Sequence, residues 1–519
     1  MDTFFQKMMP VFAILIKKVS SMNLIILRIA PIFLFSIALS SNAQADLSVH
    51  DVWSAWRNFY TESGFKFKGQ EQISNNEITI DDATLTAANR RNTSSIEIKL
   101  GTLKFSKDKN AVNISLANEM PITIIEKSDS KEVLEASLIA NVEDFEMSAD
   151  GSPSEIRFRY SASAANITLN KLKLTSLFGF SSTPRLKITQ KNIAGTTLYK
   201  NMSLAMSKHT ISGDLTTMDI FLSDSSKDYI AFVGSNDHFL FESTGASPMT
   251  MQSNIIFKQV EDGYNSEGKL KIGPLSLSLA TQENQRKFSL QSSAETNSLS
   301  YNITSAGIHY TINQSNLTYS IIDNQLPFPI LANTAQIALE LLFPIFAAEK
   351  KQDFNLLVNL DSITLKDEIW DQFDPQNNIL RYPANLIIDI TGQLQLQKNL
   401  YEIETNQSTF INPQLPTILH TLNFNEIMLN AFDAGVRGTG NFSFDNKMQP
   451  IGSLDLEITG SNQLLDKFVE IGVIQLSEVF LIRSMLSLFT IPGNDQDILS
   501  SRIEINDKGQ IFANGQRLQ

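Results

Sequence analysis

From about Phe65 to Gln325, apolar residues alternate with polar ones in short runs. The clearest runs are 77–80, 96–100, 156–160, 167–170 and 275–279. Alternation of this kind gives a strand one buried face and one solvated face. Gly, Asn and Asp separate the runs, and no strand–helix–strand rhythm is visible. The pattern predicts an antiparallel meander and disfavours a parallel α/β enzyme.

A helix is predicted ahead of the strands. Ser48 is a suitable N-cap with Asp51 three residues later, and Gly64 ends the segment. An apolar face follows at helical spacing, made by Val52, Trp53, Trp56, Phe59 and Tyr60. This face is expected to pack on a sheet.

Leu326-Pro327-Phe328-Pro329 interrupts the strand pattern. After it, the sequence predicts a helix from about Asn333 to Glu349, with Ile337, Leu341 and Leu342 inward, which Pro344 should kink or split. Strands are predicted over 354–360, 384–396, 421–429 and 438–444, and a closing hairpin over 501–505 and 509–514. Further helices are predicted around 368–373, from an N-cap at Ser461, and over about 477–490.

The last two helices carry strong apolar stripes. The first has Leu464, Leu465, Phe468 and Val469, and the second has Val479, Phe480, Met485, Leu486 and Phe489. Stripes of this size are expected to cover other apolar surface, so we expect both helices to lie across the concave face of the sheet, as a permanent plug or a movable lid.

The predicted fold is mainly β: a large curved antiparallel sheet with a few covering helices. Two regions are predicted after the leader. Residues 46–325 hold the first helix and the meander, and residues 326–519 form a β-rich part with helices. The pattern also allows these regions to be one continuous domain.

Residues 1–45 are predicted to be a signal peptide. An apolar run from Asn23 to Ser40 precedes Ala43-Gln44-Ala45, a small-x-small cleavage pattern, so the mature chain is expected to start at Asp46. A start at Met22 would give a leader of ordinary length, and a retained anchor is the alternative to cleavage. No later segment is long enough to span a bilayer, and the expected location is the periplasm.

Composition excludes several kinds of partner and reactive site. The formal net charge is −13 with no dominant basic patch, which argues against a nucleic-acid partner. The absence of Cys excludes disulfides, thiolate metal sites and a cysteine nucleophile. Five dispersed His residues (50, 209, 238, 309 and 420) show no metal-ligand spacing.

No catalytic, cofactor-binding or metal residues are predicted. The densest acidic group is Asp367–Asp374 around Trp370, which fits a solvated helical turn and, as an alternative, a cation or sugar site. Its spacing does not match a calcium loop. Gly435, Gly438 and Gly440 are interpreted as turn glycines.

Six segments carry a family resemblance: 51–56, 326–329, 353–360, 369–375, 464–467 and 513–518. Together they resemble the family known as domain of unknown function 2125, exported proteins of alphaproteobacteria. The resemblance implies a Gram-negative periplasm and brings no activity, cofactor or site residue.

The sequence therefore favours a non-enzymatic envelope protein that binds or carries a hydrophobic ligand, a lipid or a lipoprotein, in a trough of the sheet. The alternative is a structural or partner-binding periplasmic protein whose core is filled by its own helices, and an enzyme ranks third. An open apolar surface would favour the carrier, and a filled core the structural protein.

Overall fold

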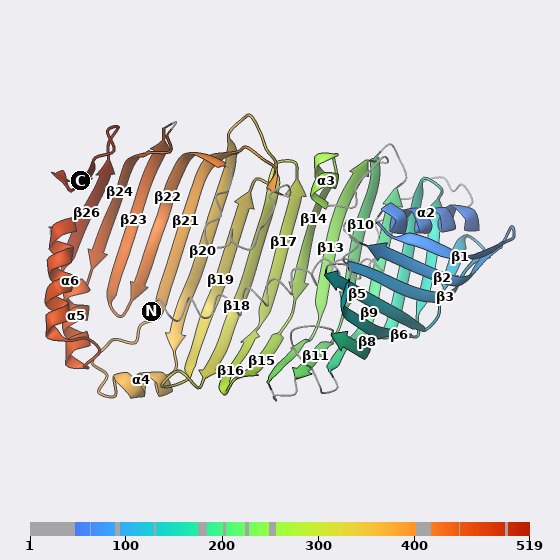
Figure 1. Cartoon of the computed structure of the whole chain (residues 1–519), viewed down its shortest axis with the longest axis horizontal. Coiled ribbons are helices and arrows are strands. Elements are labelled where there is room, and N and C mark those ends of the chain that lie inside the picture. The colour runs from blue at the N-terminus through green and yellow to red at the C-terminus, as the bar shows by residue number, and fades with distance from the viewer. Residues whose placement is uncertain are drawn as a thin grey trace. The chain divides into compact units, whose positions relative to one another are not determined.

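The computed structural model describes residues 47–62, 64–88, 94–128, 131–174, 184–200, 204–223, 228–248, 256–400, 417–445, 447–493 and 497–518. Of these residues, 68% lie in strands and 12% in helices. Their strands pair antiparallel (Figure 1). The mainly-β prediction is therefore confirmed.

The chain divides into two compact units. Unit 1 comprises Met1–Lys227 and His238–Asn254. Its described elements are α2 (Val49–Glu62), β1 (Lys66–Ile73), β2 (Glu77–Ala88), β3 (Ser94–Asp108), β4 (Ala111–Ser115), β5 (Glu119–Ser128), β6 (Lys131–Glu143), β7 (Glu146–Ser152), β8 (Glu155–Leu174), β9 (Arg185–Lys200), β10 (Leu204–Gly213), β11 (Thr216–Ser223) and β13 (Phe239–Pro248).

Unit 1 has a filled core. Helix α2 begins with the predicted capping pair: the Ser48 amide donates to Asp51 Oδ2 at 3.0 Å, and the Asp51 amide donates to Ser48 Oγ at 3.2 Å. The helix contacts β1, β2 and β3. Trp53 and Trp56 are buried, and each has a ring contact with Phe105 of β3. The predicted packing of the Trp face on a sheet is confirmed.

Unit 2 comprises Asp228–Asp237 and Ile255–Gln519. Its described helices are α3 (Ile256–Glu261), α4 (Asp367–Phe373), α5 (Ser461–Glu470) and α6 (Leu476–Phe489). Its described strands are β12 (Tyr229–Asn236), β14 (Asn265–Ile272), β15 (Leu275–Glu283), β16 (Arg286–Ala294), β17 (Thr296–Thr304), β18 (Gly307–Asp323), β19 (Ile330–Phe343), β20 (Gln352–Leu365), β21 (Ala384–Leu396), β22 (Thr417–Ala431), β23 (Ala434–Phe444), β24 (Pro450–Thr459), β25 (Ile491–Pro492), β26 (Ile498–Ile505), β27 (Ile511–Ala513) and β28 (Gln516–Arg517).

Most of unit 2 is a meander of sequence neighbours. From β18 to β24, each strand pairs with the next one along the chain, and β26 then pairs with β24. The predicted strands 354–360, 384–396, 421–429 and 438–444 all lie in this run, and the closing hairpin is β26 with β27.

The helix predicted from Asn333 to Glu349 is wrong. Most of that segment is strand β19, which ends at Phe343 immediately before Pro344. Strands β18 and β20 flank it, and Leu339 pairs with Ile312 on one side and Val358 on the other. Pairing on both edges therefore overrides a local preference for helix.

Helices α4, α5 and α6 occur close to their predicted positions. Ser461, however, is not the cap of α5, because Gly460 occupies the N-cap position. The capping acceptor comes from a distant residue: Asp497 accepts hydrogen bonds from the amides of Asn462 and Gln463, each at 3.0 Å. A carboxylate at a helix start satisfies the free amides and favours the helix dipole.

The prediction that the last two helices cover the sheet is wrong. No residue of α5 is fully buried, and α6 buries only Val479. Figure 1 shows both helices at the end of the sheet, beside β24 and β26. Phe480, one of the residues of the predicted α6 stripe, leaves 76% of its surface exposed.

Candidate functional site

Seven strands of unit 2 align their apolar side chains on one face of the sheet. Residues paired across antiparallel strands lie on the same face, so the register assigns each side chain to a side. One row runs Leu341–Leu356–Ile390–Phe424 from β19 to β22. We call this surface the apolar strip; its members are Ile337, Leu339, Leu341, Phe354, Leu356, Val358, Leu360, Leu386, Ile388, Ile390, Leu422, Phe424, Ile427, Leu429, Val436, Phe442, Leu454, Leu456, Ile458, Leu499, Ile503 and Ile505.

The apolar strip is open. None of these 22 side chains is fully buried, and Leu341, Leu356 and Leu429 expose 40%, 38% and 47% of their surface. The same face is covered where β21 ends, at Leu394 and Leu396, which are 5% and 0% exposed. The seven strands span about 29 Å at the usual spacing of about 4.8 Å. One leaflet of a bilayer core is about 15 Å thick, half of the usual 30 Å. The strip can therefore accommodate an extended acyl chain laid across the strands.

Glycines lower the surface of the strip in β23. Gly438 and Gly440 lie on the strip face, and a Cβ on Gly440 would meet the Ser453 carbonyl oxygen at 2.8 Å. The interpretation of Gly435, Gly438 and Gly440 as turn glycines is wrong, because all three are in strand β23. At this point only glycine allows the leucines of β24 to lie over the neighbouring strand.

The two ends of the strip differ. At one end, β18 extends the apolar surface to Ile308, which packs against a small core formed by Val260, Ile345 and Phe346. At the other end, Ser501 of β26 lies on the strip face, paired with Leu456. Its Oγ donates to the Phe489 carbonyl oxygen at 2.6 Å. Helix α6 therefore ends on the same side of the sheet as the strip.

The opposite face is polar and hydrogen-bonded. Asn355 Nδ2 donates to Glu340 Oε1 at 3.0 Å, and His309 Nε2 lies 2.9 Å from the same oxygen. The hydrogen bond from Asn355 is the main cause that lowers the pKa of the Glu340 carboxyl. Farther along, Arg502 pairs with Asp455 at 3.1 Å. One face of the sheet is thus apolar and the other polar, which is typical of a sheet with only one face in contact with water.

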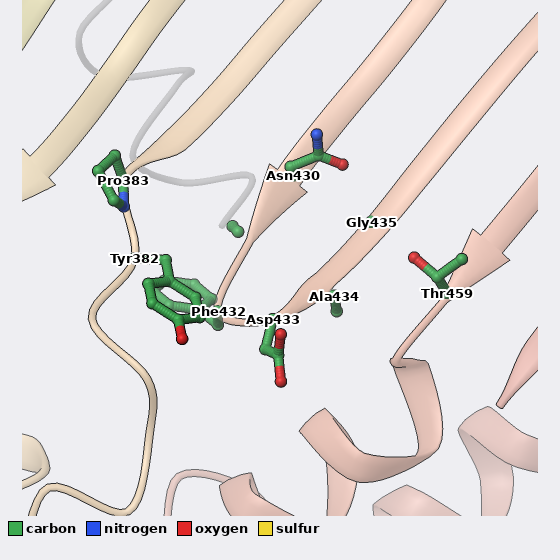
Figure 2. Close-up of a pocket in the computed structure, with 9 residues that line it drawn as sticks. Tyr382, Pro383, Asn430, Phe432, Asp433, Ala434, Gly435 and Thr459 are labelled. Atoms are coloured by element: carbon green, nitrogen blue, oxygen red, sulfur yellow. The ribbon is translucent and has the colours of Figure 1, made fainter. Parts of the chain in front are cut away.

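A pocket of about 250 Å³ lies where β22 turns into β23 (Figure 2). Phe432 and Tyr382 form its apolar side, and Asn430 and Thr459 line it from the polar face of the sheet. It is smaller than the usual range of small-molecule sites, about 300–1,000 Å³. The pocket is therefore a weaker candidate than the apolar strip.

The acidic group 367–374 is structural. Asp374 is buried, and its carboxylate accepts hydrogen bonds from the amides of Asn378 and Ile379 at 2.8 and 2.9 Å. Arg381 pairs with Asp367 at 2.9 Å and stacks over the buried Trp370 at 5.3 Å. The described residues contain no group of three or more His, Asp or Glu side chains arranged for a metal ion. The arrangement matches the predicted helical turn.

The histidines do not converge. His309 lies on the polar face of unit 2, bonded to Glu340. In unit 1, His209 is packed near the Phe59 ring, 6.2 Å away, and its Nδ1 has no hydrogen-bond partner. Burial lowers the pKa of His209 to about 4, so the imidazole is neutral at pH 7.

Residues 419–516 match the family model described as "Uncharacterized protein conserved in bacteria (DUF2125)". The match covers this segment of the chain, and it supports membership in the DUF2125 family. The DUF2125 segment runs from β22 to β28 and includes α5 and α6, so it holds one end of the apolar strip together with the exposed helix. No curated protein and no solved structure gives a significant match.

The strip itself was not predicted residue by residue. Its signal was present in the alternation of 354–360 and 384–396, but strand pairing decides which residues form continuous rows. Ala43 and Ala45, the predicted cleavage residues, lie outside the described residues. Among the described helices, none is long and apolar enough to cross a membrane.

Proposed function

We propose that this DUF2125 protein binds or carries a hydrophobic ligand, a lipid or the lipid part of a lipoprotein, on the apolar strip, without enzymatic activity and in the periplasm. The observation that carries the proposal is the open strip, in which 22 apolar side chains share one face and none is fully buried. Contiguous apolar surface of this extent marks a ligand or partner site in soluble proteins. The predicted signal peptide supports the location.

Two adjacent leucines of β20 provide the test. Leu356 lies on the strip, paired with Leu341 and Ile390, whereas Leu357 lies on the polar face, paired with Glu340 and Asp389. The probe is phosphatidylethanolamine with a fluorescent acyl chain, added to the purified mature protein. We expect saturable binding that L356D weakens about fifteenfold, because losing about two buried methylene contacts costs roughly 1.6 kcal/mol. L357D is the control and should bind as the wild type does.

Native mass spectrometry of protein purified from its own envelope should then identify the bound lipid. Equal affinities for wild type, L356D and L357D would refute the proposal. Absence of lipid binding with retention of a protein partner, lost in L356D, would favour the structural alternative.

A further inference from the structure

Helix α6 exposes apolar side chains around most of its circumference. Leu476, Phe480, Leu481 and Leu488 expose 71%, 76%, 61% and 63% of their surface. At 100° per residue, the exposed apolar positions from Leu476 to Phe489 cover an arc of about 240°. Docking into a groove of a protein partner normally uses one stripe, spaced i, i+3, i+4 and i+7. A wider apolar arc fits a surrounding lipid phase.

Glu478, exposed in the first turn of α6, accepts at Oε2 from the Gln475 amide at 2.7 Å, and two hydroxyls farther along are bonded within the helix. Ser484 Oγ donates to the Phe480 carbonyl and Ser487 Oγ to the Ser484 carbonyl, both at 2.8 Å. Such back-bonding lets hydroxyls enter an apolar medium without an unmet hydrogen bond. Arg483, the only basic residue of the helix, turns toward α5 and pairs with Asp466 at 2.8 Å. No cation is therefore presented on the exposed arc.

The length of α6 defines how it meets lipid. Its 14 residues make about 21 Å of helix, short of the roughly 30 Å bilayer core. The helix can enter the interfacial region of one leaflet but not cross the membrane. Its C-terminal end is bonded to Ser501 at the end of the apolar strip, so a helix in the leaflet would bring the strip to the lipid.

We infer that α6 is a membrane-docking element that inserts its exposed apolar arc into the surface of a lipid bilayer. The inference extends the proposed function by naming the surface on which the strip would meet its ligand. It stands on the exposure and bonding of α6, and it can fail while lipid binding on the strip holds.

The test uses the mature protein and phosphatidylcholine vesicles in a flotation assay. We expect the wild type to float with the vesicles at both low and high salt, since the exposed arc carries no cation. The variant F480S/L481S should need at least tenfold more lipid for half-maximal binding. The matched control I73S/V233S removes two other apolar side chains, which are 54% and 51% exposed, and should float like the wild type.

A second variant reports insertion directly. Phe480→Trp places an indole at the most exposed apolar position of α6, and its emission should shift to the blue and be quenched by brominated phosphatidylcholine. L356D should still float, which separates docking from ligand binding on the strip. Flotation that F480S/L481S leaves unchanged, flotation lost at high salt, or a dimer that F480S/L481S dissociates without vesicle binding in the wild type would overturn the inference.

Discussion

Matched leucine-to-alanine variants in the two units test whether the strip is open. Leu85 of β2 is 0% exposed and pairs with Phe67 and Ile98. Leu356 of β20 is 38% exposed and pairs with Leu341 and Ile390. Both residues have a paired strand on either side. They differ in whether other parts of the protein cover the face of the sheet on which the leucine lies.

The expected costs follow from burial. Leu85→Ala should lower the free energy of unfolding of unit 1 by about 2–5 kcal/mol, because it leaves a cavity in a packed core. Leu356→Ala should lower that of unit 2 by only about 1 kcal/mol. Solvent replaces the missing atoms there, and the loss is limited to cross-strand contacts and partial burial.

Hydrogen exchange at increasing urea reads the two units separately, through the amides of β2 and of β20. A loss above about 2 kcal/mol for Leu356→Ala would show that the strip is covered by a packed layer. The premise of the proposed function would then be removed. A loss below about 1 kcal/mol for Leu85→Ala would show instead that burial does not determine how much a substitution lowers the free energy of unfolding in this fold.

Three further predictions concern other residues. Asp374→Ala should destabilise unit 2 by about 2–4 kcal/mol in denaturant melts, since two buried amides lose a charged acceptor. A chelator should leave the melting curve of the wild type unchanged, and a large chelator effect would reveal a metal site around 367–374. The pKa of His209 is about 4 in the folded protein and 6.5 in the unfolded chain. The neutral imidazole therefore contributes about 3 kcal/mol of stability, which is fully present above pH 6.5 and should be lost as the pH falls toward 4. His209→Gln should flatten this dependence of stability on pH, and an unchanged slope would contradict the prediction. N-terminal sequencing of the exported protein should find Asp46 first, and Ala45→Phe should block processing; an intact leader on the wild-type protein would disprove cleavage.

Local signals predicted the parts of the fold that depend on neighbouring residues. The Ser48–Asp51 pair and the Trp53/Trp56 face are complete within one helix, so the sequence identified both. Strand β19 was missed because residues such as Ala338, Leu339 and Glu340 are compatible with a helix, and its strand conformation depends on β18 and β20. The cap of α5 was missed for a similar reason, since Asp497 is remote in sequence from Asn462.

The exposed α6 shows a different limit. Periodicity identified some of its apolar residues, such as Phe480 and Met485, and did not single out Leu476, Leu481 or Leu488. A pattern of side chains also does not say whether another surface covers them. The same ambiguity applies to the strip, where alternation fixes the two faces of each strand and leaves the contents of the apolar side undetermined.

The neighbour-to-neighbour pairing from β18 to β24 has a consequence for how such a protein can change in length. Each strand needs only the strands before and after it, so inserting one more hairpin adds about 10 Å of sheet, at about 4.8 Å per strand, without altering any distant contact. Stability and folding of such an array approximate a sum over adjacent pairs, as in repeat proteins. Evolution can therefore change the width of the sheet in steps of one hairpin. Alternation of apolar and polar residues in each added strand is enough to keep one face apolar and the other polar.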